Sequence, residues 1–580
     1  MMAKRKLTGT AVLQLLDELE SSEEESSSEE EAVDEEMSDD DNDSSTPETE
    51  IDSSDEDTRN GQVTWTKLAG TKCNFTRLPF TVTETGITFR GQAIPDDELG
   101  FLQLFLTDEL LEELVANTND YAAEKLQNVE LRPHSIWSKW KAVTLVEFKA
   151  YLGVILNMAL NDKPSVFHYF SMEWVDAMPF FIDVFPRYRF LQIHWMLHAA
   201  PITVMGSVKK ADKVQNVVNY VQDKCLHYFS PGREITIDET TIAFKGRVSC
   251  KMYNPQKPTK WGLRVYVLAD SETGYVSVFQ PYYGKETTDV LIRPDLPFTS
   301  RIVLHLVEEL LAKSTGTGYH LYTDRFYTGY YLATELHNKG LHLTGTVMKN
   351  RQGLPAEVKK KQKMKVHDVV AYKASSDVMV LCWQDKRQIL MLSNYHDADI
   401  QTVQRHTKRG QVVDIKKPTV IIDYTSKMGA VDRADHLCSS YNFARKSLKW
   451  WRKLFFWLLE ICAVNSYIIF NLHRKTNNVR EVSHMKYRKK LIELLVGGIR
   501  NSSRRRGRPT RDHAERLNNK SHFIDQLEDG KAKDCAVCSD RKTSGQRKTT
   551  VYYCKTCSKH PGLHPKKCFE AYHSSVDYKK

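Results

Sequence analysis

Hydrophobic positions along the chain change their spacing near residue 231. Between Asp96 and about Pro231 they recur at helical intervals, as in TLVEFKAYLGVILNMAL at residues 144–160. Thr107, which is followed by two acids and a Leu-rich run, is typical of a capped helix start. The pattern therefore predicts a helical region that ends at about Pro231.

From Glu234 the pattern turns to short β-rich runs that alternate with helical segments. In EITIDETTIAF, Ile235 and Ile237 fall on one side of a strand and Asp238 falls on the other. A hairpin, helix, strand, helix and strand then follow at 261–284, 301–313, 319–324, 328–340 and 341–347. This is the order expected of an α/β, ribonuclease-H-like core, and a β-rich insertion follows it at about residues 350–417.

Two acids open a long helical pattern at residues 429–470. Asp432 and Asp435 lie three positions apart, so on a helix both carboxylates share one face. Asp238 in the first strand and Asp324 at the end of a later strand make a set of four, which such a core would bring to one edge of its sheet. Carboxylates there can hold two Mg²⁺ ions, which stabilise the attacking and leaving oxygens of a phosphodiester reaction.

Each acid taken alone has a simpler interpretation. A single Asp at a strand end is most often a solvated carboxylate, and an acid pair can merely complement a helix N-terminus. Asp423 and Glu239 also lie nearby in sequence, but neither has a helical or strand partner that argues for it. The predicted catalytic set is therefore the four Asp residues, with Mg²⁺ or Mn²⁺ as the expected metal.

A basic and aromatic block follows the acid pair, and a second basic cluster, RRRGRPTR, begins at Arg504. Such residues can bind phosphates, stack on bases or enter a narrow minor groove. The alternatives are that the tryptophans belong to a core and that the second cluster is a nuclear-import signal, which favours a nuclear location. The candidate DNA contacts are Arg445, Lys446, Lys449, Trp450, Arg504, Arg506 and Arg508.

The charge of the chain is unevenly distributed. Residues 1–60 hold 22 acidic and 4 basic residues, whereas the remainder carries 78 basic and 52 acidic residues. A body that basic favours nucleic acid as a partner. The Ser- and acid-rich tail over about residues 7–60 is too polar to fold, and it either carries phosphorylation sites or simply aids solubility.

No secretion or membrane segment is expected. The N-terminus lacks a sustained apolar core, and the longest apolar run, residues 454–470, is interrupted by Glu460, Asn465 and Ser466. The protein is therefore predicted to be intracellular.

Five of the 11 cysteines fall in the last 46 residues. They include two CxxC pairs, and His residues follow at a spacing that suits tetrahedral zinc. Two zinc ions in a cross-braced arrangement are expected, and so short a segment would hardly fold without them. The candidate ligands are Cys535, Cys538, Cys554, Cys557, His560, His564, Cys568 and His573.

Several of these pieces resemble the piggyBac family of DNA transposases and its domesticated derivatives. They are TIDETTIAFKGR, KWGLRVYVLADSETGYV, HLYTDRFYTGYYL, IIDYTSKMGAVDRADHLCSSY and the Cys-rich tail with CFEAYH, and together they span most of residues 96–573. Asp238, Asp324 and Asp432 match the family's catalytic aspartates, and Asp435 matches its fourth acid. Trp450 matches a tryptophan implied to act near a DNA hairpin.

The resemblance implies a cut-and-paste transposase with five regions. It would bind the terminal inverted repeats of a transposon as a homodimer, excise the element through hairpin intermediates and join it to TTAA targets. The regions are an acidic tail and lead-in (1–95), a first helical dimerisation and DNA-binding part (96–231), the catalytic domain (232–436), a second helical part with a basic linker (437–520) and a zinc domain (530–580) that binds transposon ends. The alternatives are a domesticated DNA-binding protein without transposition activity and a structure-selective nuclease.

Overall fold

The computed structural model divides the chain into two compact units, residues 1–499 and residues 500–580. The described residues are 63–127, 129, 131, 135–204, 209–255, 259–360, 363–406, 411–443, 447, 449–497, 499, 516–517, 521–528, 530–540, 545–575 and 578. The predicted acidic tail over residues 7–60 lies outside them, as do Arg445, Lys446, Arg504, Arg506 and Arg508.

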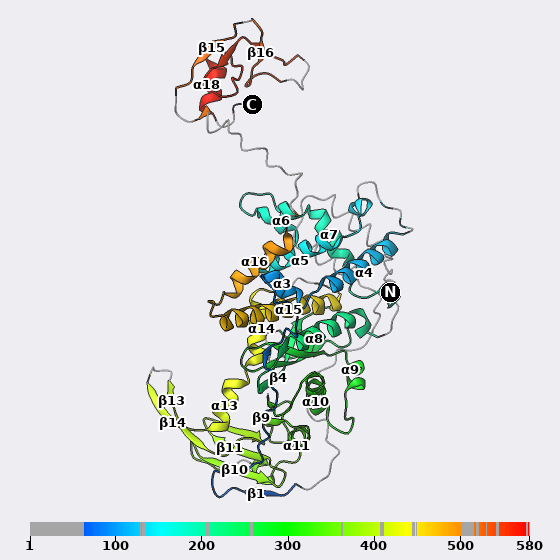
Figure 1. The fold of residues 1–580 in the computed structure, drawn as a ribbon, viewed down its shortest axis with the longest axis vertical. Helices are drawn as coiled ribbons and strands as arrows, with labels where there is room; N and C mark the ends of the chain where they lie inside the picture. Colours follow the sequence, from blue (N-terminus) through cyan, green and yellow to red (C-terminus); the bar gives the residue numbers. More distant parts are fainter. Residues whose placement is uncertain are drawn as a thin grey trace, which may run out of the picture. The chain divides into compact units, whose positions relative to one another are not determined.

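One mixed sheet of ten strands runs through the lower part of the first unit as drawn in Figure 1. Its order is β1-β10-β11-β12-β9-β8-β4-β6-β5, with β7 paired to β6. β4, β8 and β9 are parallel to one another, and the other pairings are antiparallel. The strands are β1 (Trp65–Lys67), β4 (Glu234–Ala243), β5 (Met252–Tyr253), β6 (Trp261–Asp270), β7 (Val276–Pro281), β8 (His320–Thr323), β9 (His342–Thr346), β10 (Val369–Ala374), β11 (Met379–Gln384) and β12 (Gln388–Ser393).

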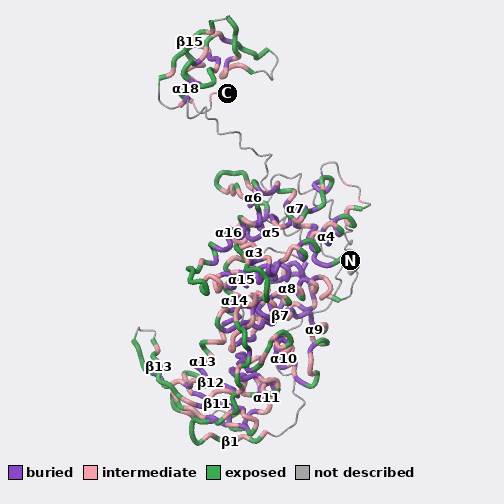
Figure 2. Tube along the Cα trace, in the orientation of Figure 1, coloured by how far each residue is buried: buried purple, intermediate pink, exposed green. Residues whose placement is uncertain are grey.

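Helices cover both faces of this sheet because its central strands are apolar on both sides. Along β6, Tyr266 and Leu268 belong to a core shared with the helices α10 (Phe298–Leu311) and α11 (Tyr330–Asn338). Val265 and Val267 alternate with them and join a second core. Figure 2 shows buried residues concentrated where the sheet meets the helices of that second core. The predicted α/β architecture is confirmed.

The second core contains the helical part of the chain. Thr107 and Thr144 cap the starts of α4 and α5 by accepting hydrogen bonds from backbone amides, so both predicted helix starts are confirmed. The helices are α3 (Glu98–Gln103), α4 (Asp108–Leu126), α5 (Leu145–Leu160), α6 (Pro179–Val184), α7 (Arg187–Met196), α8 (Gln215–Tyr228), α15 (Trp450–Thr476) and α16 (His484–Val496). α15 is long and apolar enough to cross a membrane, but 89% of its most apolar window is buried inside the fold, as in a core helix.

Two segments outside the predicted core strands contribute to the main sheet. The segment predicted as a β-rich insertion does form strands, and β10, β11 and β12 extend the sheet beside β9. Only β13 (Ile400–His406) and β14 (Val412–Pro418) pair as a hairpin of their own (Figure 1). The lead-in expected to belong with the acidic tail supplies β1 at the sheet edge and β2 (Gly86–Ile87), which pairs with β3 (Phe229–Ser230).

The long helical pattern around the acid pair is divided into separate helices. α14 (Ala430–Ser440) carries the acids, and α15 begins only at Trp450. Between them Tyr441 has a non-helical backbone, with φ −145° and ψ 67°, and its carbonyl accepts a hydrogen bond of 2.9 Å from Arg488 of α16. A further helix, α13 (Thr419–Lys427), precedes α14, and the sequence pattern does not predict it.

The C-terminal unit is small and built from short elements. β15 (Ile524–Gln526) pairs with β18 (Tyr552–Cys554), β16 (Lys533–Asp534) pairs with β17 (Thr549–Thr550), and α18 spans Lys567–Ser574. Its buried cluster contains Cys554, Cys557, Leu563 and Tyr572. So few apolar side chains give little hydrophobic stabilisation, which is typical of domains stabilised by metal.

Candidate active site and metal centres

Asp238 and Asp324 are brought together by the register of the parallel strands. Ile237 of β4 pairs with Thr323 of β8, which pairs in turn with Gly345 of β9. Asp238, Asp324 and Thr346 each come one residue after these paired positions. Two acids separated by 86 positions in the sequence therefore follow neighbouring positions of β4 and β8, at the carboxyl end of β8.

The turn after β8 holds Asp324 in place. One of its carboxylate oxygens accepts a hydrogen bond of 2.8 Å from the amide of Phe326, and its carbonyl accepts the amide of Thr328 at 3.1 Å. The hydroxyl of Thr328 also donates to that carbonyl, at 2.7 Å. Gly345 on β9 leaves room for this hydroxyl, because a Cβ there would collide with Thr328 Oγ1 and the carbonyl of Thr323. The neighbouring strand thus helps to fix the Asp324 backbone.

The electrostatics of Asp324 favour a cation. Burial, followed by the nearby charge of Glu239, raises the pKa of its carboxyl to about 6, although amide hydrogen bonds from Phe326 and Tyr327 act in the opposite direction. An ionised carboxylate held in this way is costly without a positive partner. A divalent ion that prefers oxygen ligands fits this site, because it would compensate the charge of both Asp238 and Asp324.

Glu239 has a different partner from Asp238. Its carboxylate accepts a hydrogen bond of 2.7 Å from Tyr327. Asp238 instead accepts its own neighbouring amide, that of Glu239, at 2.9 Å. Successive side chains of a strand point to opposite faces of the sheet, so Asp238 and Glu239 lie on different faces.

Asp432 and Asp435 both lie on α14, which packs against β4 and β6. Asp432 is exposed and Asp435 is half-buried. Arg433 between them donates to the carbonyl of Ser271 after β6. Where the structure describes the chain, however, no three carboxylates have their oxygens all within 4.8 Å of one another. The structure thus packs α14 on the strand that carries Asp238 without gathering the four carboxylates into one cluster.

Two of the predicted DNA contacts are buried in this structure. Lys449 is 7% exposed and its ammonium group lies 5.3 Å from the ring centre of Tyr121 on α4. Trp450 is 3% exposed and its ring packs edge-on against Tyr283, with centres 5.8 Å apart. The start of α15 is part of the helical core here, as the alternative interpretation of the tryptophans predicts, and DNA contact by these two residues stays a prediction.

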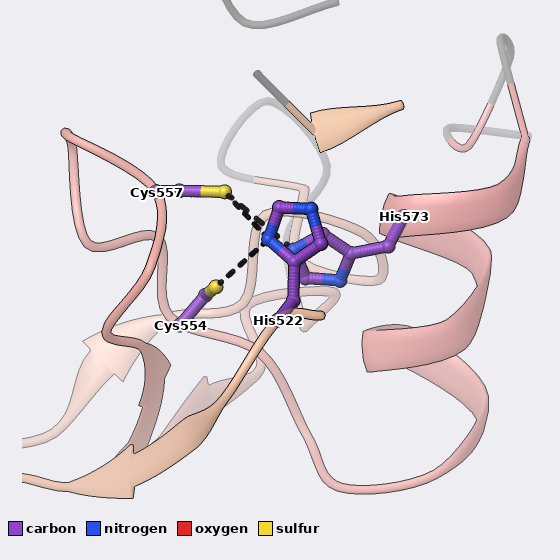
Figure 3. A group of neighbouring side chains, drawn as sticks. All are labelled: His522, Cys554, Cys557 and His573. Atoms are coloured by element: carbon purple, nitrogen blue, oxygen red, sulfur yellow. Dashed lines mark hydrogen bonds between the residues drawn. The ribbon is translucent and has the colours of Figure 1, made fainter. Parts of the chain in front are cut away.

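Two groups of four Cys and His side chains occur in the C-terminal unit. In each group the possible ligand atoms all lie within 4.8 Å of one another. Figure 3 shows the first group, in which the sulfur of Cys557 lies 3.6 Å from both His522 Nδ1 and His573 Nε2. The first group is His522, Cys554, Cys557 and His573, and the second is Cys535, Cys538, His564 and Cys568. Thiolate and imidazole in fours suit a tetrahedral zinc ion.

His560 is not in either group, which corrects the predicted ligand set. It has a positive φ of 43°, and its Nδ1 lies 3.2 Å from the carbonyl oxygen of Cys554. His522 takes the eighth position instead. It precedes the first CxxC pair by 13 residues, so spacing around the cysteines gave no signal for it. The groups interleave along the chain, as a cross-braced arrangement requires.

Backbone carbonyls orient two of these histidines. His573 Nδ1 lies 2.8 Å from the carbonyl of Phe569, which leaves Nε2 facing the first group. His564 Nε2 lies 3.1 Å from the carbonyl of Thr549, which leaves Nδ1 facing Cys538 at 3.4 Å. Such partners fix the tautomer and ring orientation of a ligating histidine.

Comparison with known proteins identifies the family. A family model described as Transposase IS4 matches residues 97–467. Human PiggyBac transposable element-derived protein 3 is 26% identical over 483 residues, which cover 82% of this chain and 75% of that protein. This chain belongs to the piggyBac family of transposases. Human PiggyBac transposable element-derived protein 5 is 22% identical over 436 residues, which cover 73% of this chain and 79% of that protein.

The fold of the piggyBac family is also found by structural comparison. A cryo-EM structure of the piggyBac transposase synaptic complex with hairpin DNA matches with a TM-score of 0.63 at 22% identity, covering 80% of this chain and 97% of the other. The predicted ribonuclease-H-like core is thereby confirmed. A second family model, described as a DDE_Tnp_1-like zinc finger, matches residues 517–574 and spans both Cys and His groups. Membership of a transposase family implies a divalent metal.

Proposed function

We propose that this protein is a metal-dependent cut-and-paste DNA transposase. It binds the terminal inverted repeats of its transposon, excises the element by strand cleavage and hairpin formation, and integrates it at TTAA sites. The observation that carries the proposal is the parallel register of β4 and β8, which Asp238 and Asp324 follow, with the acid-bearing helix α14 packed on β4.

In this proposal Asp238, Asp324, Asp432 and Asp435 hold Mg²⁺ or Mn²⁺. The metal, when bound, stabilises the attacking and leaving oxygens of the phosphodiester. The chain positions the carboxylates: the turn after β8 fixes Asp324, and Arg433 anchors α14 to the strand end. α14 brings its two acids to the site when the cation is present, because the cation removes the repulsion between carboxylates.

The C-terminal unit is proposed to hold two zinc ions and to contact transposon-end DNA. The four ligands of each group suit zinc better than Mg²⁺, because thiolates are soft ligands. The piggyBac transposase that this chain resembles in fold was solved as a complex with hairpin DNA, and the basic body of this chain suits the same class of ligand. Action on two transposon ends calls for a homodimer, and action on chromosomal DNA calls for a nuclear location.

A second candidate is a domesticated DNA-binding protein that keeps the fold without transposition. The names of the human relatives, which describe proteins derived from transposable elements, favour it. The four acids are all present, which favours the enzyme.

Excision from a reporter gene in cells tests the proposal. The reporter is interrupted by DNA carrying the genomic ends that flank this gene, and the wild type is compared with Asp324→Asn, which keeps the side-chain shape but removes a charge. The expected result is precise, TTAA-restoring excision by the wild type only. Binding to those ends without any excision would instead support the domesticated binder.

A further inference from the structure

A polar network links Asp423 of α13 to buried residues of the strands next to the acids. One of its carboxylate oxygens accepts a hydrogen bond from the hydroxyl of Tyr322 on β8 and lies 2.9 Å from Nε2 of His396. Burial alone would raise the pKa of this carboxyl, but the bonds from His396 and Tyr322 lower it, so the group is charged. Because both partners use the same oxygen, Asp423 ties α13 to the sheet.

The partners of Asp423 are themselves held by the sheet. His396 Nδ1 lies 3.1 Å from the hydroxyls of Thr344 and Ser393, which belong to β9 and β12. His320 on β8 links Tyr322, at 3.1 Å, to Thr344, at 2.8 Å. Three adjacent strands therefore contribute to one network. Such a fixed network is rigid, because each buried member has a hydrogen-bonding partner.

The next residue, Tyr424, faces the catalytic acids. Its hydroxyl bonds to Thr346, the β9 residue that the register sets beside Asp324. Burial, and then the charges of Asp324 and Asp238, raise the pKa of Tyr424 to about 12, so both carboxylates are close to the phenol. At the other end of α13 the carbonyl of Lys427 accepts a hydrogen bond of 3.0 Å from Thr236, two residues before Asp238 on β4.

From this geometry we infer that Asp423 is a positioning residue for the metal-binding acids. Its bonds to Tyr322 and His396 fix α13, so that Tyr424 stays packed beside Asp238 and Asp324 and α14, which follows α13, starts in the correct place. The inference rests on the proposed function, since it assumes that these acids bind metal. One carboxylate oxygen of Asp423 is engaged by this network, through Tyr322 and His396.

Outer partners of this kind change metal affinity by about 10- to 100-fold when removed. The test is titration of Mn²⁺ into the full-length protein by calorimetry, comparing wild type, Asp324→Asn, Asp423→Asn and Tyr322→Phe. The site of interest is the Mn²⁺ site that the wild type has and Asp324→Asn lacks. Mn²⁺ that binds elsewhere on the chain is seen in both proteins and is subtracted. The matched control is Asp385→Asn, which breaks an ion pair with Arg405 in the same unit, away from the acids.

Asp423→Asn is expected to weaken Mn²⁺ binding at that site by about 10-fold or more, whereas Asp385→Asn leaves it unchanged. Tyr322→Phe removes one hydroxyl and keeps the charge of Asp423, so it should weaken Mn²⁺ binding by less than Asp423→Asn does. It provides the test if Asp423→Asn fails to fold. Wild-type affinity in both network variants, even with a lower melting temperature, would show a merely structural role and overturn the inference. If the wild type binds no more Mn²⁺ than Asp324→Asn, the proposed function fails as well.

Discussion

Replacing Asp324 with Asn is expected to stabilise the metal-free protein at neutral pH. The carboxyl of Asp324 has a pKa of about 6 in the folded protein, against an ordinary value of 3.8, chiefly because it is buried. A group whose pKa is raised by folding favours the fold below its unfolded pKa, and that contribution is lost as the pH rises through the folded value. Above about pH 6 the ionised side chain therefore opposes folding.

The size of the effect follows from the shift in pKa. About two pKa units, at about 1.4 kcal/mol each, give about 3 kcal/mol of destabilisation at neutral pH relative to an uncharged side chain of the same shape. The difference in the free energy of unfolding between wild type and Asp324→Asn should shrink between about pH 6 and pH 4 and vanish at lower pH. Added Mg²⁺ should stabilise the wild type and leave the variant unchanged.

Urea unfolding followed by tryptophan fluorescence, in buffer without Mg²⁺, measures this difference. Asp385→Asn is a suitable comparison, because the bonds of Asp385 to Arg405 lower the pKa of that carboxyl. Its removal should destabilise the protein at neutral pH, and its effect should fade in acid. If Asp324→Asn is no more stable than the wild type at neutral pH without metal, the claim that burial of the ionised Asp324 carboxylate destabilises the fold is wrong.

Further substitutions test the supports of the site and the metal ligands. Arg488→Met should lower the free energy of unfolding by about 3–5 kcal/mol, because it leaves a buried carboxylate, Glu460, without its partner. Lys490→Ala on the same helix breaks an exposed ion pair, and in the same urea assay it should lower that free energy by about 1 kcal/mol or less. Gly345→Ala should destabilise by about 1–3 kcal/mol, since the carbonyl of Thr323 leaves no room for a methyl group, and a normal unfolding midpoint would contradict this. His522→Ala should reduce bound zinc from two equivalents per chain to one, whereas His560→Ala should keep both, as measured by metal content. Loss of zinc in His560→Ala but not in His522→Ala would reverse the ligand assignment.

The order of strands and helices could be predicted because it depends on local patterns. Alternating residues in β4 and helical spacing in α4 and α5 are properties of short windows, and caps such as Thr107 mark the starts. The neighbouring positions of Asp238 and Asp324 follow from the parallel pairing of β4 with β8, which that order of elements requires. This part of the site is therefore encoded in features that a single sequence shows.

Other features depend on partners far away in the chain. The break between α14 and α15 is stabilised by Arg488, which lies 47 residues beyond Tyr441. Lys449 is buried because Tyr121 of α4 packs on it, and the residues near position 449 give no sign of that contact. His522 joins its metal group only once β15 and β18 have paired. Tertiary contacts of this kind override a prediction based on neighbouring residues.

Strand cleavage by the purified full-length protein tests the central claim most directly. The substrate is a supercoiled plasmid carrying the genomic ends that flank this gene, with and without Mg²⁺, and the proteins are the wild type and single Asp→Asn variants at positions 238, 324, 432 and 435. We predict cleavage at the ends by the wild type in Mg²⁺ only, and loss of cleavage in each of the four variants. Cleavage that persists in Asp324→Asn, or that needs no divalent metal, would contradict the proposed metal-dependent mechanism.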